Sequence, residues 1–139
     1  AIFVEIRVKV VSTNWQDTLL SLVYGNVSSR IYISTESVGF GTHIGRVYQF
    51  VVNDTNRYHV YRLEFFPNTE TYKMYTDGTL RFTSSRTMTT SLPDRIRIGN
   101  WGSDWQAEMY IDYVRAGYMS QSISGETSSW GAVKSWFQQ

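Results

Sequence analysis

The sequence predicts an all-β domain, a sandwich or a barrel, followed by a short helix near the C-terminus. Apolar and polar residues alternate with a period of two over much of the 139 residues, which is the pattern of half-buried strands. Turn signals separate the alternating segments at spacings of roughly 8–12 residues, as in sandwiches and barrels. Aromatic residues make up 16% of the chain, and aromatic and β-branched residues favour strands.

The first strand is predicted over residues 3–10, where Val4, Ile6 and Val8 alternate with charged side chains. The same alternation recurs in eight further segments: residues 19–24, 29–34, 46–52, 58–66, 71–75, 79–83, 95–99 and 109–115. Turn signals lie between these segments, at residues 25–26, 37–41, 53–54, 67–68, 77–78, 93–94 and 100–104. Among them, Asp77-Gly78 predicts a two-residue type I′ hairpin, because this pair readily adopts the positive φ angles of that turn.

The C-terminal segment breaks the strand pattern. Residues 121–129 are rich in Ser and Gly, and the apolar residues Trp130, Val133 and Phe137 then follow at helical spacing behind helix-capping residue types. We therefore expect a β-sandwich over residues 1–120 and a tail over residues 121–139 that contains a short helix. This tail would dock on the sandwich, on a neighbouring domain or on a second copy of the chain. The abrupt start inside a strand pattern is typical of a product trimmed from a longer protein.

Charge and composition disfavour several functional classes. The formal net charge is +1 and the chain has no run of five like charges, whereas nucleic-acid binders usually carry a basic stripe. It also lacks the run of about 18 apolar residues that a transmembrane helix needs. The absence of Cys excludes disulfides and thiolate zinc sites. Ten of the 13 basic residues are Arg, which suits contacts with carboxylates and sugars as well as ordinary cross-strand pairing.

Four segments carry a resemblance to a known superfamily. They are a Tyr-Arg strand, a Tyr-Thr-Asp-Gly hairpin, an Ile-Arg-Ile-Gly strand and an Ile-Asp-Tyr-Val-Arg strand, at residues 58–63, 72–78, 95–100 and 110–115. In this order, and with the opening strand before them, they resemble the laminin-G-like branches of the concanavalin A-like lectin/glucanase superfamily. The resemblance spans about residues 2–118, and its motifs are structural.

The resemblance implies a jelly-roll sandwich of two curved antiparallel sheets. Members of this superfamily often bind carbohydrate on the concave sheet or its rim loops, and many bind calcium. Some are glycoside hydrolases or polysaccharide lyases, and others are adhesion modules without catalysis. A secreted, extracellular location follows from the resemblance as an expectation, and calcium follows as a candidate cofactor.

The resemblance also directs attention to a carboxylate pair and to the histidines. Glu108 and Asp112 correspond to the ends of the hydrolase Glu-x-Asp-x-Glu motif, but their Cα atoms would lie roughly 13 Å apart on an extended strand. Glycosidase carboxyl groups lie about 5–9.5 Å apart, so we expect Asp112 to bond backbone groups or an Arg instead. His59 lies beside Tyr58 and near Arg62 in sequence, which allows the hypothesis of a lyase site. The alternative is that His59 is a structural histidine held by hydrogen bonds.

A calcium site would draw on loop oxygens. The loop carboxylates are Asp17, Asp54, Asp94 and Asp104. They show no EF-hand spacing, so the sequence leaves the metal ligands unknown.

The loop tryptophans are the main candidates for ligand binding. Trp101 and Trp105 flank Asp104 and follow Asn100 in a predicted turn, and Trp15 lies in a similar polar loop. Indole rings stack on the C–H faces of sugars, while amide and carboxylate groups bond the hydroxyls. The alternative is that these rings fold back over the end of the sandwich.

A second candidate surface comes from the strand alternation. If Val114 points inward, its neighbours Tyr113 and Arg115 point to the open face. In the same way, Arg95 and Arg97 point away from the core if Ile96 and Ile98 point inward. This pattern sets Tyr110 and Asp112 on the same face as Val114. Arg97, Tyr113 and Arg115 would then line one polar and aromatic surface; a solvated face with cross-strand pairs is the alternative.

The sequence therefore favours a non-catalytic extracellular carbohydrate-binding or adhesion module of a larger secreted protein. Its expected partner is a polysaccharide or glycan, with no nucleic acid and no membrane span. The expected ligand-binding residues are Trp101, Trp105, Asp104, Asn100, Arg97, Tyr113 and Trp15. Two alternatives remain, a glycoside hydrolase or polysaccharide lyase of the same fold and a structural subunit of a surface assembly.

Overall fold

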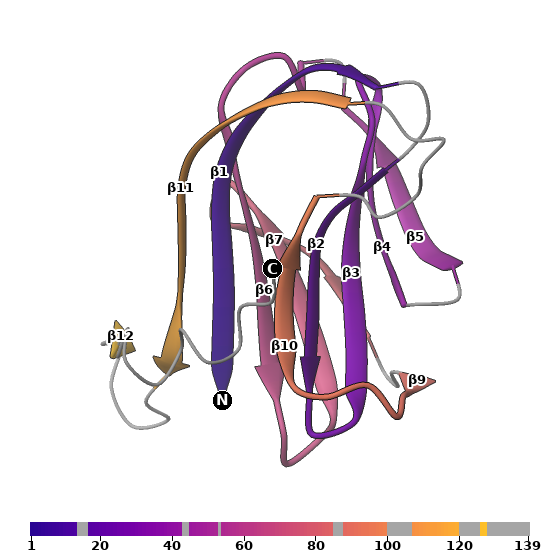
Figure 1. The fold of residues 1–139 in the computed structure, drawn as a ribbon, viewed down its shortest axis with the longest axis vertical. Helices are drawn as coiled ribbons and strands as arrows, with labels where there is room; N and C mark the ends of the chain where they lie inside the picture. Colours follow the sequence, from indigo (N-terminus) through magenta and orange to yellow (C-terminus); the bar gives the residue numbers. More distant parts are fainter. Residues whose placement is uncertain are drawn as a thin grey trace.

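The chain folds as a two-sheet antiparallel jelly-roll sandwich, as the sequence predicts (Figure 1). The computed structural model describes residues 1–13, 17–42, 45–52, 54–84, 88–99, 107–119 and 126–127. Within these ranges the secondary structure consists of β-strands and turns. The described part of the chain contains no helix with the length and apolar character that a membrane span requires.

Sheet A, the first of the two sheets, has the strand order β12-β11-β1-β6-β7-β8. Its strands are β1 (Ile2–Thr13), β6 (His59–Phe66), β7 (Thr71–Thr76), β8 (Thr79–Thr83), β11 (Ala107–Met119) and β12 (Glu126–Thr127). Strands β1 and β11 pair over nearly their whole lengths and curve together at one end of the molecule (Figure 1). Sheet A therefore joins the beginning of the chain to segments more than 100 residues later.

Sheet B has the order β10-β2-β3-β4-β5, with β9 pairing to β3 beside this path. Its strands are β2 (Asp17–Tyr24), β3 (Val27–Ile33), β4 (Ser37–Thr42), β5 (Gly45–Val51), β9 (Met88–Thr89) and β10 (Arg95–Ile98). The register places Arg97 opposite Ser21, Ser21 opposite Arg30 and Arg30 opposite Gly41. Residues at matching positions of four strands therefore form one row across the sheet.

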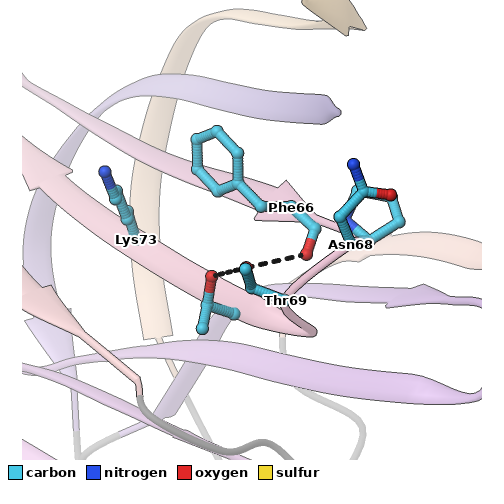
Figure 2. A pocket seen from close by; sticks show the side chains of 6 residues that line it. Phe66, Asn68, Thr69 and Lys73 are labelled. Atoms are coloured by element: carbon cyan, nitrogen blue, oxygen red, sulfur yellow. Dashed lines mark hydrogen bonds between the residues drawn. The ribbon is translucent and has the colours of Figure 1, made fainter.

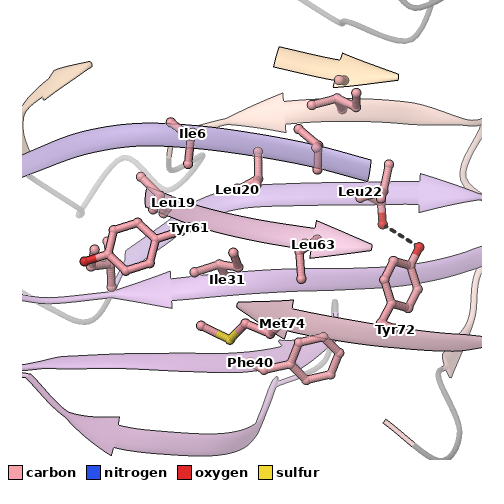
Figure 3. Close-up of a cluster of buried hydrophobic side chains, with 14 of the residues drawn as sticks. Ile6, Leu19, Leu20, Leu22, Ile31, Phe40, Tyr61, Leu63, Tyr72 and Met74 are labelled. Atoms are coloured by element: carbon pink, nitrogen blue, oxygen red, sulfur yellow. Dashed lines mark hydrogen bonds between the residues drawn. The ribbon is translucent and has the colours of Figure 1, made fainter. Parts of the chain in front are cut away.

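The core lies between the two sheets and is built from their alternating apolar positions (Figure 3). In β1, Val4, Ile6 and Val8 are fully buried, as the opening alternation predicts. Sheet B contributes side chains such as Leu20 and Phe40 from the opposite side. Burying a side chain of this size stabilises the fold by about 1.5–3 kcal/mol relative to leaving it exposed, so this layer is the main source of stability.

Tyr72 of β7 links the two sheets directly. Its side chain is fully buried, and its hydroxyl donates to the carbonyl oxygen of Val27 at 3.0 Å, with that of Leu22 at 3.4 Å. Both carbonyls belong to the β2–β3 hairpin of sheet B (Figure 3). Burial is the main reason why the pKa of Tyr72 is raised, so the hydroxyl remains a donor.

The backbone angles confirm the predicted hairpin at Asp77-Gly78 and the predicted turn at Gly25-Asn26. Asp77 and Gly78 have φ angles of 49° and 81° between β7 and β8, and Gly25 and Asn26 have φ angles of 57° and 66° between β2 and β3. Positive φ at both central residues is the condition for a type I′ turn.

One predicted turn is wrong. Residues 37–41 were expected to form a turn, but they belong to β4, in which every residue is buried. Val38 and Phe40 point into the core, whereas Gly39 and Gly41 occupy the alternate positions. The turn was predicted because glycine is depleted in strands and common in turns. Pairing of this segment with β3 and β5 makes it a strand instead.

The predicted face of β11 is also partly wrong. Tyr110 lies opposite Lys9, outside the core, and not on the inward face with Val114. A β-bulge is the cause: Arg7 pairs with Tyr113 and Val8 pairs with Ile111, which leaves Asp112 without a register partner. One extra residue reverses the alternation along the rest of the strand. The predicted helix over residues 130–137 lies outside the described residues.

We expect Tyr72→Phe to lower the free energy of unfolding by about 1–2 kcal/mol, because it leaves buried carbonyl oxygens without their donor. Urea denaturation of both proteins measures this loss. Tyr48→Phe is the matched control, since Tyr48 stacks on Phe82 at the margin of the core. An equal loss in both variants would show that the Tyr72 hydroxyl contributes nothing special.

Candidate functional site

Most of the sequence-predicted ligand residues lie outside the described residues. These are Trp15, Asn100, Trp101, Asp104 and Trp105. Their roles in ligand binding remain predictions. The structure describes the two other candidates, Arg97 and Tyr113.

The structure does not bring Arg97 and Tyr113 together. Arg97 belongs to β10 in sheet B, between the inward residues Ile96 and Ile98, so it points to the outer face of sheet B. Tyr113 and Arg115 point to the outer face of sheet A. The predicted common surface of Arg97, Tyr113 and Arg115 is therefore wrong. Alternation places these three side chains on the outward side of their strands, but it does not tell which sheet each strand joins.

Tyr113 takes part in an ionic network on the outer face of sheet A. The centre of this network is Glu5, only 6% exposed, which lies opposite both Arg62 and Arg115 in the register. Its carboxylate contacts Arg115 at 2.7 Å and Arg62 at 3.3 Å, and it accepts a 3.0 Å hydrogen bond from the Tyr113 hydroxyl. Arg62 also bonds Glu64 at 2.9 Å. The network joins β1, β6 and β11, and its carboxylate and guanidinium charges compensate one another.

Glu108 and Asp112, the two carboxylates compared with the hydrolase motif, have separate partners. Asp112 forms a 2.6 Å ion pair with Arg7, and Glu108 accepts a hydrogen bond from the Tyr110 hydroxyl at 3.0 Å. The pairing of Asp112 with an Arg is the contact that the sequence favoured. The Tyr110 bond raises the pKa of that hydroxyl, because the nearby carboxylate disfavours the phenolate. The two acids thus have different partners and form no shared acid–base pair.

His59 is a structural histidine held between two aspartates. Its Nδ1 lies 2.6 Å from the Asp77 carboxylate, and its Nε2 lies 3.0 Å from the carbonyl oxygen and 3.2 Å from a carboxylate oxygen of Asp54. All three partners are acceptors, so the imidazolium, with two N–H donors, satisfies them best. Burial alone lowers the pKa of His59, but the hydrogen bonds and charges of Asp77 and Asp54 outweigh it, and the net shift is upward.

The described residues contain no group of three His, Asp or Glu side chains suited to a metal ion. The side chains of Asp17 and Asp104, two of the predicted loop carboxylates, are outside what the structure describes. Asp54 contacts His59, and Asp94 accepts a 2.9 Å hydrogen bond from the Gly25 amide. Calcium remains a sequence-based prediction.

Arg97 belongs instead to a cluster of three arginines on the outer face of sheet B, which we call the arginine face: Arg30, Arg95 and Arg97. Arg95 and Arg97 alternate with the inward isoleucines of β10, and Arg30 precedes the inward Ile31 of β3. Ser21, which carries only a small side chain, lies between Arg97 and Arg30 in the cross-strand row. The side chains of Arg97 and Arg30 are therefore the largest in this row.

The guanidinium group of Arg95 lies within electrostatic reach of the other two. Burial lowers the pKa of Arg95, and the positive charges of Arg97 and Arg30 lower it further. Arg95 is only 8% exposed, whereas Arg30 and Arg97 are half-buried. Among the outward positions of sheet B whose side chains the structure describes, none is Asp or Glu. This face thus gathers three of the ten arginines, although the net charge of the chain is only +1.

Sequence reasoning identified Arg97 as a ligand residue but missed Arg30 and Arg95. The alternation of β10 places Arg95 beside Arg97 on one face. The position of Arg30 in this cluster depends on the sheet order β10-β2-β3, which pairs segments about 70 residues apart in sequence. No local pattern indicates that order.

No protein-family model matches the chain. No curated protein matches it either. Among solved structures, the chain is similar to the CBM40 of the Ruminococcus gnavus IT-sialidase, with a TM-score of 0.45 and 21% identity. This match covers 61% of this chain and 53% of that one.

Two further structures show the same CBM40 with bound sugars. The form with α2,3 sialyllactose gives a TM-score of 0.44, 21% identity and coverage of 61% of this chain and 53% of that one. The form with α2,6 sialyllactose gives 0.42, 19% identity and coverage of 85% and 65%. This chain thus spans about half to two-thirds of the length of those chains.

We expect Glu5→Gln to lower the free energy of unfolding by about 1–3 kcal/mol, because Arg62 and Arg115 lose the carboxylate between them. Urea denaturation measures the change. Glu36→Gln, which removes the same charge from an exposed turn, should be nearly neutral. A Glu5→Gln protein as stable as the parent would mean that the network contributes no net stability.

We expect the His59 contacts to stabilise the fold at acidic pH and to weaken as pH rises. A histidine whose pKa is raised on folding gives its full stabilisation below the unfolded value of about 6.5, and this is lost as pH passes the folded value. Urea unfolding between pH 5 and 8.5, with NMR titration of His59, measures both effects. Asp77→Asn, which still allows the turn, should lower the pKa of His59. A wild-type pKa at or below 6.5 would contradict the assigned contacts.

Proposed function

We propose that this chain is a carbohydrate-binding module whose arginine face recognises acidic sugars. The observation that carries the proposal is the gathering of Arg30, Arg95 and Arg97 on the outer face of sheet B. Guanidinium groups gathered on one face favour an anionic ligand, because each of them can form charge-assisted hydrogen bonds with it.

A carboxylate on a rigid sugar ring suits this surface well. The guanidinium group is planar, always charged and able to bind a carboxylate through two parallel hydrogen bonds. Arg95 is largely removed from water, which strengthens its interaction with an anion relative to an exposed side chain. Arg30 and Arg97 remain half-exposed on either side of Ser21, where a ligand can approach them.

The proposal extends to the loop that follows β10. Trp101 and Trp105 would stack on the sugar rings, with Asp104 and Asn100 bonding hydroxyls, and Trp15 would extend the binding surface. The support for this part is the chemistry of these residue types and their position in the chain directly after Arg97 and Ile98. We further propose an extracellular, non-catalytic role within a larger protein, with calcium as a loop cofactor. The superfamily resemblance supports these points.

We expect acidic sugars to bind more tightly than their uncharged analogues. Isothermal titration calorimetry with sialyllactose against lactose, and with digalacturonate against its methyl ester, tests this directly. Affinity for the acids should fall as salt concentration rises, because half-exposed charges are screened. Equal binding of the neutral and acidic sugars would overturn the acidic-sugar assignment.

We expect Arg97→Gln and Arg30→Gln each to weaken binding of the acids by about tenfold or more, the effect of losing a charged hydrogen bond. Arg57→Gln is the matched control, because it removes the same charge from an exposed position in the β5–β6 connection. Arg95 is left intact, since its burial makes a folding defect harder to separate from lost binding. Unchanged affinity in both arginine-face variants would exclude this face.

The Trp101→Ala/Trp105→Ala double variant tests the loop separately. We expect it to weaken binding of the acidic sugars, because stacking depends on the sugar ring and adds to the contacts of the charged group. Glycan-array binding of the variant and the parent measures this. Unchanged binding would remove the two tryptophans from the site while leaving the arginine face untouched.

A further inference from the structure

We propose that a pocket at the β6–β7 turn is a second ligand site, which takes a single neutral pyranose residue. We call it the turn pocket. It has a volume of about 290 Å³ and is lined by Phe66, Pro67, Asn68, Thr69, Thr71 and Lys73. Small-molecule sites usually have volumes of about 300–1,000 Å³, and this pocket lies at the lower end of that range. Its volume therefore suits a monosaccharide and not a longer chain.

The turn that forms the pocket is held by its own hydrogen bonds. The Thr69 amide donates to the carbonyl oxygen of Phe66, and the Glu70 amide donates to that of Pro67, each at 3.3 Å. Glu70 closes the turn with a φ of 52°. The pocket therefore lies on a hairpin whose strands, β6 and β7, are paired up to Phe66 and Thr71. The hairpin would therefore lose little conformational freedom when a ligand binds.

One wall of the pocket is apolar. It consists of the Phe66 ring and the Pro67 ring, and the Lys73 ammonium lies 5.0 Å from the centre of the Phe66 ring. Figure 2 shows Lys73 on one side of the Phe66 ring and Asn68 and Thr69 on the other. The C–H face of a pyranose packs against such rings, as it does against other aromatic side chains.

The polar groups of the pocket offer both donors and acceptors. The hydroxyls of Thr69 and Thr71 lie 2.7 Å apart, and the Thr69 hydroxyl donates to the Phe66 carbonyl oxygen at 3.5 Å. With that proton committed, Thr71 donates to Thr69, and both oxygens offer only lone pairs to a ligand. Lys73 supplies donors, and the Asn68 amide supplies both kinds.

This combination matches sugar hydroxyls, which donate and accept at neighbouring positions. The charge of Lys73 does not make the pocket strongly cationic, because the register places Glu64 opposite Lys73 and the exposed Glu70 lies in the turn itself. The arginine face lies on sheet B, whereas the turn pocket lies on a hairpin of sheet A. The two sites are thus independent, and together they would give avidity for a surface that displays several glycan chains.

NMR titration of the full chain with methyl glycosides of glucose, galactose, mannose and N-acetylglucosamine tests the turn pocket. We expect at least one of them to shift the amide signals of residues 66–73 with saturation at roughly millimolar concentration, the range for such small ligands. The absence of saturable shifts for all four sugars would overturn the proposal.

Two variants assign these shifts to the pocket. Phe66→Leu removes the ring face and Lys73→Met removes the ammonium, and each should weaken binding by about threefold to tenfold. Lys9→Met is the matched control, because Lys9 also lies over tyrosine rings on the outer face of sheet A. Circular dichroism and thermal unfolding verify that each variant folds. If both pocket variants bind like the parent, the site lies elsewhere.

Arg97→Gln separates this proposal from the acidic-sugar site. It should leave the shifts of residues 66–73 unchanged, since the two sites are on different sheets. Loss of those shifts in Arg97→Gln would mean that a single site accounts for both kinds of sugar, and the turn pocket would be withdrawn.

Discussion

The burial of one face of each sheet against the other is the constraint on which the structure depends. Tyr72 shows it most clearly, because its ring fills the core from sheet A while its hydroxyl donates to carbonyl oxygens of the β2–β3 hairpin in sheet B. A chain without Cys has no disulfides to hold two sheets together. The packed layer between the sheets must therefore fix both their distance and their relative register.

Once the inner faces are committed to the core, function is left to the outward positions, and the two sheets use them differently. On sheet A, Glu5 lies among Arg62, Arg115 and Tyr113, so the charges compensate one another and stabilise the strand order. On sheet B, Arg30, Arg95 and Arg97 lie together on the outer face. The ion pairs of sheet A serve stability, whereas a group of like-charged side chains on one face is typical of a binding surface.

Much of the fold was predictable because it follows from local rules. The Asp77-Gly78 hairpin requires only the φ preferences of two residues, and the inward positions of β1 require only alternation. Two errors have equally local causes. The glycines of β4 led to the prediction of a turn, and the bulge at Asp112 reversed the alternation of β11. A bulge adds one residue without any marked change in composition, so the sequence pattern does not reveal it.

The sequence by itself determined the all-β class, the hairpins and the inward or outward direction of most strand residues, because these depend on neighbours within a few positions. Only the tertiary structure decided which strands share a sheet. That choice separated Arg97 from Tyr113, joined Arg97 to Arg30 through β2, and placed Glu5 between β6 and β11. The physical reason is that strand pairing depends on the packing of the whole core, whereas alternation depends only on the geometry of a single strand.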